Sequence, residues 1–229
     1  MATQTHFTPE LFEFLSELRA NNDRDWFGAN KGRYEEHVKE PLLEFIVDFE
    51  PYLHSISEHF VADSRANGGS MFRIYRDVRF SKDKSPYKTQ AAVHFRHEAG
   101  KSAHAPGFYL HLAPDEVFAG AGIWRPDSPT VGRIRRRIVE DPNGWKSAVG
   151  DPRFAEKFDL TGDSLKRPPK GFDPEHPYLE DLKRKDHVAT CHFDEDEVTA
   201  AGFIDAFADA CRTSSPYMEF LTAAVGLPY

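Results

Sequence analysis

Apolar residues in the first sixty positions recur every three or four residues, which is the spacing of an amphipathic helix. Thr8 and Pro9 open the first helix, because threonine is a favoured N-cap and proline suits the first helical position. Two more helical segments follow, and Pro51 is expected to kink or split the last of them. The pattern therefore predicts a helical N-terminal region that ends near Phe60.

After a loop at residues 66–69 the period of the apolar residues changes to two, which is typical of β-strands. Short connections between the strands favour antiparallel pairing. Helical patterns return after Ser128, near 195–211 and after Pro216, and the region up to about residue 186 predicts short helices and a short strand. The predicted strands are 71–80, 89–97, 107–113, 116–124 and 187–193.

These patterns predict a single α+β domain that spans residues 1–229. Its antiparallel sheet has about five strands, with a core at 71–124 and a late strand near 187–193. N-terminal and C-terminal helices cover this sheet. No internal repeat or low-complexity linker divides the chain.

The first predicted strand carries an unusual set of charges. Phe72, Ile74, Val78 and Phe80 fall on one face, and the other face holds Arg73, Tyr75, Asp77 and Arg79. Arg76 breaks the alternation, because it falls among the apolar residues. A buried and unpaired guanidinium is very costly, so Arg76 requires a carboxylate partner or a bulge that turns it outward.

The net charge of −8 is distributed unevenly along the chain. Residues 71–101 contain eight Lys or Arg and three Asp or Glu, a local charge of +5, which leaves 21 basic and 34 acidic residues, or −13, elsewhere. Proteins that bind nucleic acid mainly through its backbone are usually basic overall. A basic patch on an acidic body instead favours a small anionic ligand bearing phosphate or carboxylate, and nucleic acid is not the expected partner.

We therefore expect an anion-binding site on the 71–88 strand and hairpin. Asp77 is a poor general base, because neighbouring cations lower the pKa of its carboxyl group, and it is better suited to orienting arginines. A catalytic role for the site is left open. The candidate ligand-binding residues are Arg73, Tyr75, Arg76, Asp77, Arg79, Lys84, Tyr87 and Lys88.

Two other interpretations explain the same residues. The patch could belong to an interaction module that docks an acidic protein or nucleic-acid segment, with binding that falls steeply as salt rises. Alternatively, the charges form a structural network of ion pairs on the face of the sheet that holds a helix in place. The sequence specifies no reaction, substrate or oligomeric state.

Other common site chemistries find no support in the sequence. It lacks the glycine-rich phosphate-binding motifs and the Gly-x-Ser-x-Gly elbow, so no cofactor is predicted. His94 and His97 would point to opposite faces of their strand, and no metal site is predicted. Cys191 and Cys211 fit the core of a cytoplasmic protein. No apolar run is long enough to span a membrane, and the N-terminus resembles no secretion signal.

The motif Arg73-x-x-Arg76-Asp77-x-Arg79-Phe80, followed by Lys84 and Pro86-Tyr87-Lys88, resembles the signature of an uncharacterised conserved family, domain of unknown function 2461. The resemblance covers nearly the whole chain. It implies no catalytic role for any residue, and it implies that the hallmark positions of the family are Arg73, Arg76, Asp77, Arg79, Phe80, Lys84 and Tyr87. Further similar segments are Asn21-Asn22, Trp26-Phe27, Trp124-Arg125-Pro126, Lys170-Gly171-Phe172, His176-Pro177 and Leu182 to Lys185.

Overall fold

The N-terminal region is helical, as the sequence predicts. A computed structural model describes residues 4–100 and 104–229. Helix α1 spans Pro9–Ala20, and α2 (Arg24–Tyr34) is capped by the Asp23 carboxylate, which accepts hydrogen bonds from two backbone N–H groups. A π-helical segment, η1 (Glu35–Lys39), joins α2 to α3 (Glu40–Ile56) without a break in helical dihedral angles. Helix α3 continues through Pro51, so this proline does not split it.

The sheet has five strands among the described residues, and all neighbouring strands are antiparallel. Its order is β1-β2-β3-β5-β4, with β3 in the centre. The prediction of an α+β fold with a five-stranded antiparallel sheet is confirmed. The strands are β1 (Ala91–Arg96), β2 (Gly107–Ala113), β3 (Glu116–Ile123), β4 (Asp159–Thr161) and β5 (His187–Phe193).

The remaining helices lie where the sequence predicts helical segments. Gly202 has a left-handed φ of 94° and interrupts the helix expected near 195–211. The remaining helices are α4 (Ser128–Glu140), α5 (Pro142–Val149), α6 (Pro152–Lys157), α7 (Leu179–Lys183), α8 (Glu195–Thr199), α9 (Phe203–Thr213) and α10 (Ser215–Val225). No helix of the described residues is long and apolar enough to cross a membrane.

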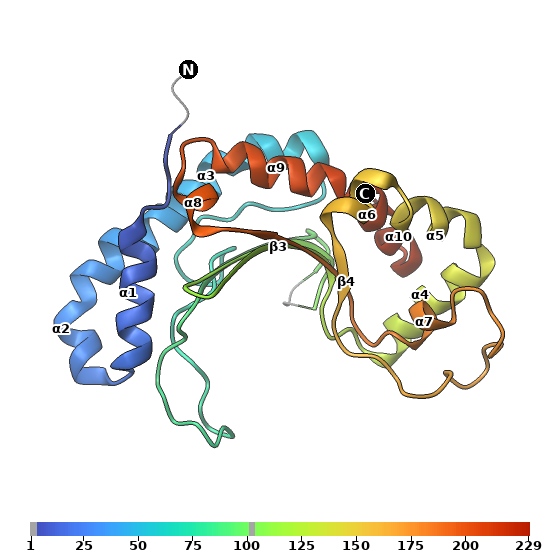
Figure 1. Cartoon of the computed structure of the whole chain (residues 1–229), viewed down its shortest axis with the longest axis horizontal. Coiled ribbons are helices and arrows are strands. Elements are labelled where there is room, and N and C mark those ends of the chain that lie inside the picture. The colour runs from blue at the N-terminus through green and yellow to red at the C-terminus, as the bar shows by residue number, and fades with distance from the viewer. Residues whose placement is uncertain (1–3, 101–103) are drawn as a thin grey trace.

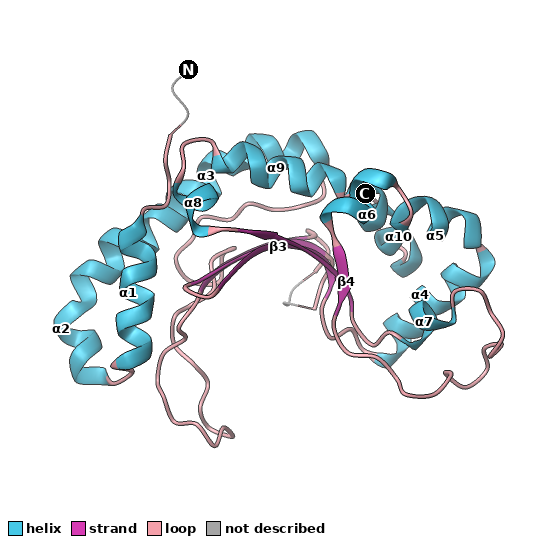
Figure 2. Ribbon diagram, viewed as in Figure 1, coloured by secondary structure: helices cyan, strands magenta, loops and turns pink. Residues whose placement is uncertain are grey.

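Helices α3 and α9 cover one face of the curved sheet (Figures 1 and 2). The core between these layers is aromatic, with Phe49 lying 4.8 Å from Phe95 and 4.9 Å from Phe207, measured between ring centroids. Helices α1 and α2 flank one end of the sheet, and α4, α5, α7 and α10 form a lobe at the other. No described helix crosses the opposite face, which we call the open face (Figure 1).

The predicted strand at 71–80 is wrong. Residues 71–90, which we call the arm, form an irregular hairpin that projects beyond the sheet (Figure 1). Its two limbs meet at an isolated bridge between Tyr75 and Tyr87. Alternating residues alone do not make a strand, because each strand also needs a continuous partner for its backbone. At the tip, Phe80 is 95% exposed instead of packing into the core.

Candidate functional site

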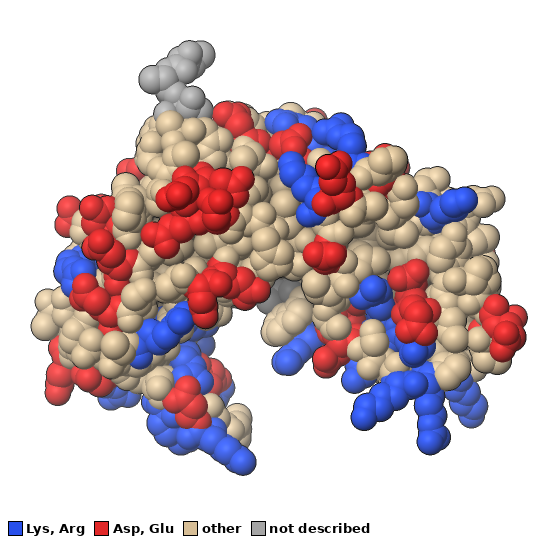
Figure 3. Space-filling model, in the orientation of Figure 1, with Lys and Arg blue, Asp and Glu red and all other residues tan. Residues whose placement is uncertain are grey.

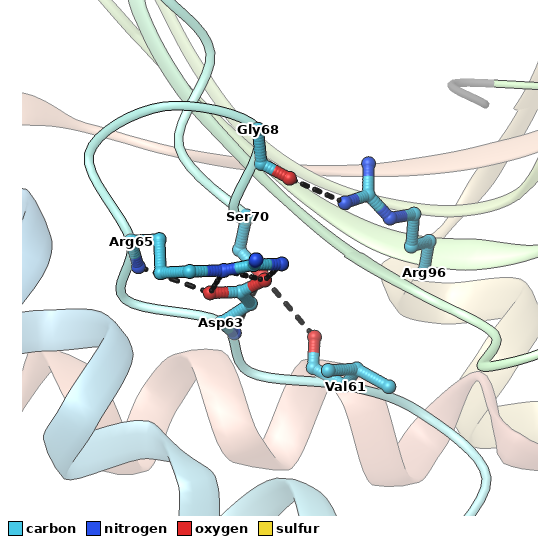
Figure 4. Close-up of polar contacts among 6 residues, drawn as sticks. All are labelled: Val61, Asp63, Arg65, Gly68, Ser70 and Arg96. Carbon is cyan, nitrogen blue, oxygen red and sulfur yellow. Dashed lines mark hydrogen bonds and ion pairs between the residues drawn. The ribbon is translucent and has the colours of Figure 1, made fainter. Parts of the chain in front are cut away.

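A compact loop fixes the base of the arm to the edge of the sheet (Figure 4). The backbone N–H of Asp63 donates to the Ser70 hydroxyl at 2.9 Å, and the N–H of Ser70 donates to the Asp63 carbonyl at 2.7 Å. The Asp63 carboxylate also pairs with Arg65. From β1, Arg96 donates to the Gly68 carbonyl at 2.9 Å, so the loop is bound to the strand beside it.

Tyr87 ties the arm to the N-terminal helices. The Asn22 side-chain amide donates to the Tyr87 carbonyl and accepts from its N–H, both at 3.0 Å. The Tyr87 ring stacks on Phe27 at 4.1 Å. Burial raises the pKa of the Tyr87 hydroxyl. Tyr87 is thus an internal anchor, and the residue is 6% exposed, which leaves little surface for a ligand.

Arg76 has a carboxylate partner, which is one of the two arrangements that the sequence requires for it. Its guanidinium pairs with the carboxylate of Asp83 across the arm and donates to the Ser85 carbonyl at 3.1 Å. Hydrogen bonds from Ser85, together with Arg76, lower the pKa of Asp83 to about 2. This pair closes the outer part of the hairpin, so both charges are used within the arm.

Asp77 orients one arginine, Arg79. Its carboxylate accepts from Arg79 Nε at 2.9 Å and Nη2 at 2.6 Å. These hydrogen bonds lower the pKa of Asp77 to about 2, as the sequence predicts in direction, so the carboxylate is ionised at neutral pH. Lys84 donates to the Val78 carbonyl at 2.9 Å, and the Tyr75 ring is 53% exposed.

Arg73 and Lys88, like the exposed Lys82, differ from the paired cations of the arm. Neither side chain has a hydrogen bond or an ion pair with any residue that the structure describes. The Lys88 ammonium lies 5.1 Å from the centre of the Phe72 ring. Burial lowers the pKa of Lys88, and the positive charge of Arg73 lowers it further. Two neighbouring cations, one of them half-buried, therefore lack a counter-charge within the described chain.

Phe72 connects these cations with the open face of the sheet. Its ring lies 6.4 Å from His94 on β1 and 6.0 Å from Tyr109 on β2. The strand register continues this surface through His111 and Phe118, which are direct cross-strand partners. Reasoning from the sequence placed no candidate residue on β2, so it missed the side chains that face outward from this strand. The alternation of Phe108, Leu110 and Leu112 was the signal that Tyr109 and His111 face the other way.

The space-filling surface is hollowed between the arm and the α4–α7 lobe, and Lys and Arg side chains gather on both of its lower edges (Figure 3). Elsewhere, residues 113–117 and 192–195 line a cavity of about 540 Å³. That cavity includes the carboxylates of Asp115, Glu116, Asp194 and Glu195, so its charge is wrong for an anion.

Among the residues that the structure describes, the histidines and cysteines form no second centre. His94 lies on the open face with its pKa lowered to about 4 by burial, whereas His97 bonds to the Pro228 carbonyl at 3.0 Å. No group of three His, Cys, Asp or Glu residues within 4–100 and 104–229 is arranged to hold a metal ion. Cys191 and Cys211 are both buried and free.

The fold and the site define an α+β protein with an open-faced sheet and a basic arm beside that face. The profile of a family described as a conserved hypothetical protein, DUF2461, matches residues 10–220. The chain belongs to this family, and the match runs from α1 to α10 and includes the arm. No curated protein matches the sequence.

Proposed function

We propose that this protein binds a small anionic ligand, bearing phosphate or carboxylate, at Arg73 and Lys88. The observation that carries the proposal is the half-buried Lys88 ammonium, which lies beside a second cation and has no carboxylate partner in the described chain. Removing a cation from water is unfavourable unless a counter-charge compensates it. A bound anion would supply that counter-charge to both groups.

The other candidate residues take supporting roles in this proposal. Arg76 and Arg79 are each engaged with a carboxylate, and Lys84 with a carbonyl, so they maintain the shape of the arm. Tyr87 anchors it, and the exposed Tyr75 is free to donate a hydrogen bond to a ligand. Asp77, with a pKa of about 2, and His94, with a pKa of about 4, are poorly suited to proton transfer at neutral pH. The proposal therefore concerns the binding of a ligand and assigns no proton transfer to these residues.

Calorimetric titration with pyrophosphate and with citrate tests the proposal. Charge-assisted hydrogen bonds contribute about 1.5–3 kcal/mol, so Lys88→Met and Arg73→Gln should each weaken binding by about tenfold to a hundredfold. Lys82→Met is the matched control, because it removes one positive charge from the same arm at an exposed position. Absence of binding by the unmodified protein, or an equal loss in the control, contradicts the proposal.

One observation favours a second function, docking of an acidic protein segment. Phe80 is 95% exposed at the tip of the arm, and Arg79 lies 5.9 Å from its ring centre. Exposed aromatic and arginine side chains are frequent anchors of protein interfaces. Poly-glutamate should then bind with strong salt dependence, and Phe80→Ser should weaken it. Binding unchanged by Phe80→Ser argues against docking at the tip.

We further propose a cytoplasmic location. Cys191 and Cys211 are free and buried, as is usual for proteins of a reducing compartment. Cell fractionation of the tagged full-length chain tests this, and recovery in a secreted fraction contradicts it.

A further inference from the structure

The three lysines of the arm differ in what their ammonium groups contact. Lys84 donates to the Val78 carbonyl at 2.9 Å, and Lys82 is exposed to solvent. Lys88 is partly buried, and its ammonium lies 5.1 Å from the centre of the Phe72 ring without a hydrogen bond or ion pair to any other described residue. Among these lysines, Lys88 therefore combines partial burial with an amine that no polar group of the described chain engages.

The backbone around Lys88 is held from two directions. Its N–H donates to the Ile74 carbonyl at 2.7 Å, on the opposite limb of the arm. The preceding residue, Tyr87, has both of its backbone groups bound by the Asn22 side chain, each at 3.0 Å. The bond to Ile74 also sets Lys88 against the segment that carries Arg73. Lys88 is thus placed beside a second cation on a backbone that is fixed before any ligand binds.

The surroundings of Lys88 favour its neutral amine. Partial burial lowers the pKa of Lys88, and the positive charge of Arg73 lowers it further. Each unit by which a lysine pKa falls raises the fraction of free amine at neutral pH about tenfold. The free amine is a nucleophile and the ammonium ion is not. Lysines that are desolvated or lie next to another cation are therefore the ones activated to form Schiff bases with carbonyl compounds.

We infer that Lys88 captures a small 2-oxo acid as an imine, while the neighbouring Arg73 binds the carboxylate of the same molecule. This inference rests on the proposed function, because Arg73 and Lys88 are its anion site, and it adds a carbonyl group to the ligand. In a 2-oxo acid the carboxylate is bonded directly to the carbonyl carbon, so two neighbouring side chains can engage both groups. A carboxylate on Arg73 offsets the smaller of the two effects on the Lys88 amine, and burial, the larger effect, remains.

The chemical step is a reversible condensation. The Lys88 nitrogen attacks the carbonyl carbon and forms a C–N bond, and the carbonyl oxygen leaves as water with two protons from the amine. Addition of a proton from solvent gives the iminium ion, which keeps a positive charge beside the bound carboxylate. The step is neither an oxidation nor a reduction, and water reverses it.

Reductive trapping followed by mass spectrometry tests the inference. The full-length protein is incubated with pyruvate and cyanoborohydride, which reduces the iminium ion and makes the adduct permanent. We expect one carboxyethyl group per chain, located at Lys88 by peptide mapping. Lactate, which carries the same carboxylate without the carbonyl group, should slow the labelling. Lys82→Met is the matched control, because it removes an exposed lysine of the same arm and should leave the yield unchanged.

Two further variants separate the nucleophile from its charge. Lys88→Arg keeps a cation but has no nucleophilic amine, so it should form no adduct and yet bind pyrophosphate more tightly than Lys88→Met. Arg73→Gln should slow the trapping of pyruvate about tenfold or more, because it removes a charge-assisted contact with the carboxylate. Trapping of acetaldehyde, which has no carboxylate, should slow by less.

Labelling spread over the exposed lysines, or a yield that falls equally in Lys82→Met, overturns the inference. Equal slowing of pyruvate and acetaldehyde by Arg73→Gln overturns the role of Arg73 in holding the carboxylate. If pyrophosphate binds and pyruvate gives no adduct at Lys88, imine capture is wrong and the anion site stands. If neither compound binds or reacts, the proposed function is wrong as well.

Discussion

The Asn22–Tyr87 contact is the point at which one substitution should release the arm. Asn22 lies in the turn between α1 and α2, and its amide satisfies both backbone groups of Tyr87, 65 positions later. Asn22→Ala removes both hydrogen bonds and leaves the partly buried N–H and C=O of Tyr87 without protein partners. At about 1 kcal/mol for each bond, we expect a loss of about 2 kcal/mol. For a chain of this size that corresponds to a fall of about 4–8 °C in Tm.

Thermal denaturation and amide hydrogen exchange measure this effect, with Asn21→Ala as the matched control. The Asn21 amide is exposed and makes one local bond to the Glu17 carbonyl at 2.9 Å, so its loss should cost less than half as much. The Tyr87 amide should also exchange much faster in Asn22→Ala, and pyrophosphate should bind more weakly. The reasoning is refuted if the two variants are equally stable, or if the Tyr87 amide stays protected.

Three other predictions concern single residues. Arg76→Met should lower Tm by about 1–3 °C, because the Asp83 side chain of its ion pair is 60% exposed to solvent, and should leave pyrophosphate affinity unchanged in calorimetry. Burial lowers the pKa of His187 from 6.5 to about 3, so the unfolded chain binds more protons between these pH values. Stability should therefore fall as pH drops through this window, by up to about 1.4 kcal/mol per pH unit, and urea unfolding of His187→Phe should show a shallower slope. Phe80→Ser should leave Tm within about 1 °C, because the ring is 95% exposed.

The strands that pack on the helices were predictable from the sequence. Strands β2 and β5 have the predicted limits, because their alternating residues are bounded by clear turns and each is paired along its full length. The segment 71–80 has an equally regular pattern and yet forms no strand. Its conformation depends on Asn22 and Phe27, which are distant in sequence, and a local pattern carries no information about such partners.

The candidate site was predictable in part. The sequence indicates that Arg76 requires a carboxylate and that Asp77 pairs with an arginine, and both pairs join residues within seven positions of each other. It does not indicate which cations remain without a partner, since that depends on where every carboxylate lies in space. The contact of Lys88 with Phe72, and that of Phe72 with Tyr109, arise only when the arm folds over the edge of the sheet.

The pKa of the Lys88 ammonium group tests the central claim most directly. NMR titration of its side chain, assigned by comparison with Lys88→Met, measures its pKa with and without pyrophosphate. Without the anion, the pKa should lie below the ordinary 10.5, because the group is half-buried beside Arg73. Saturating pyrophosphate should raise it. An ordinary pKa that pyrophosphate leaves unchanged would contradict the claim that Arg73 and Lys88 form an uncompensated anion site.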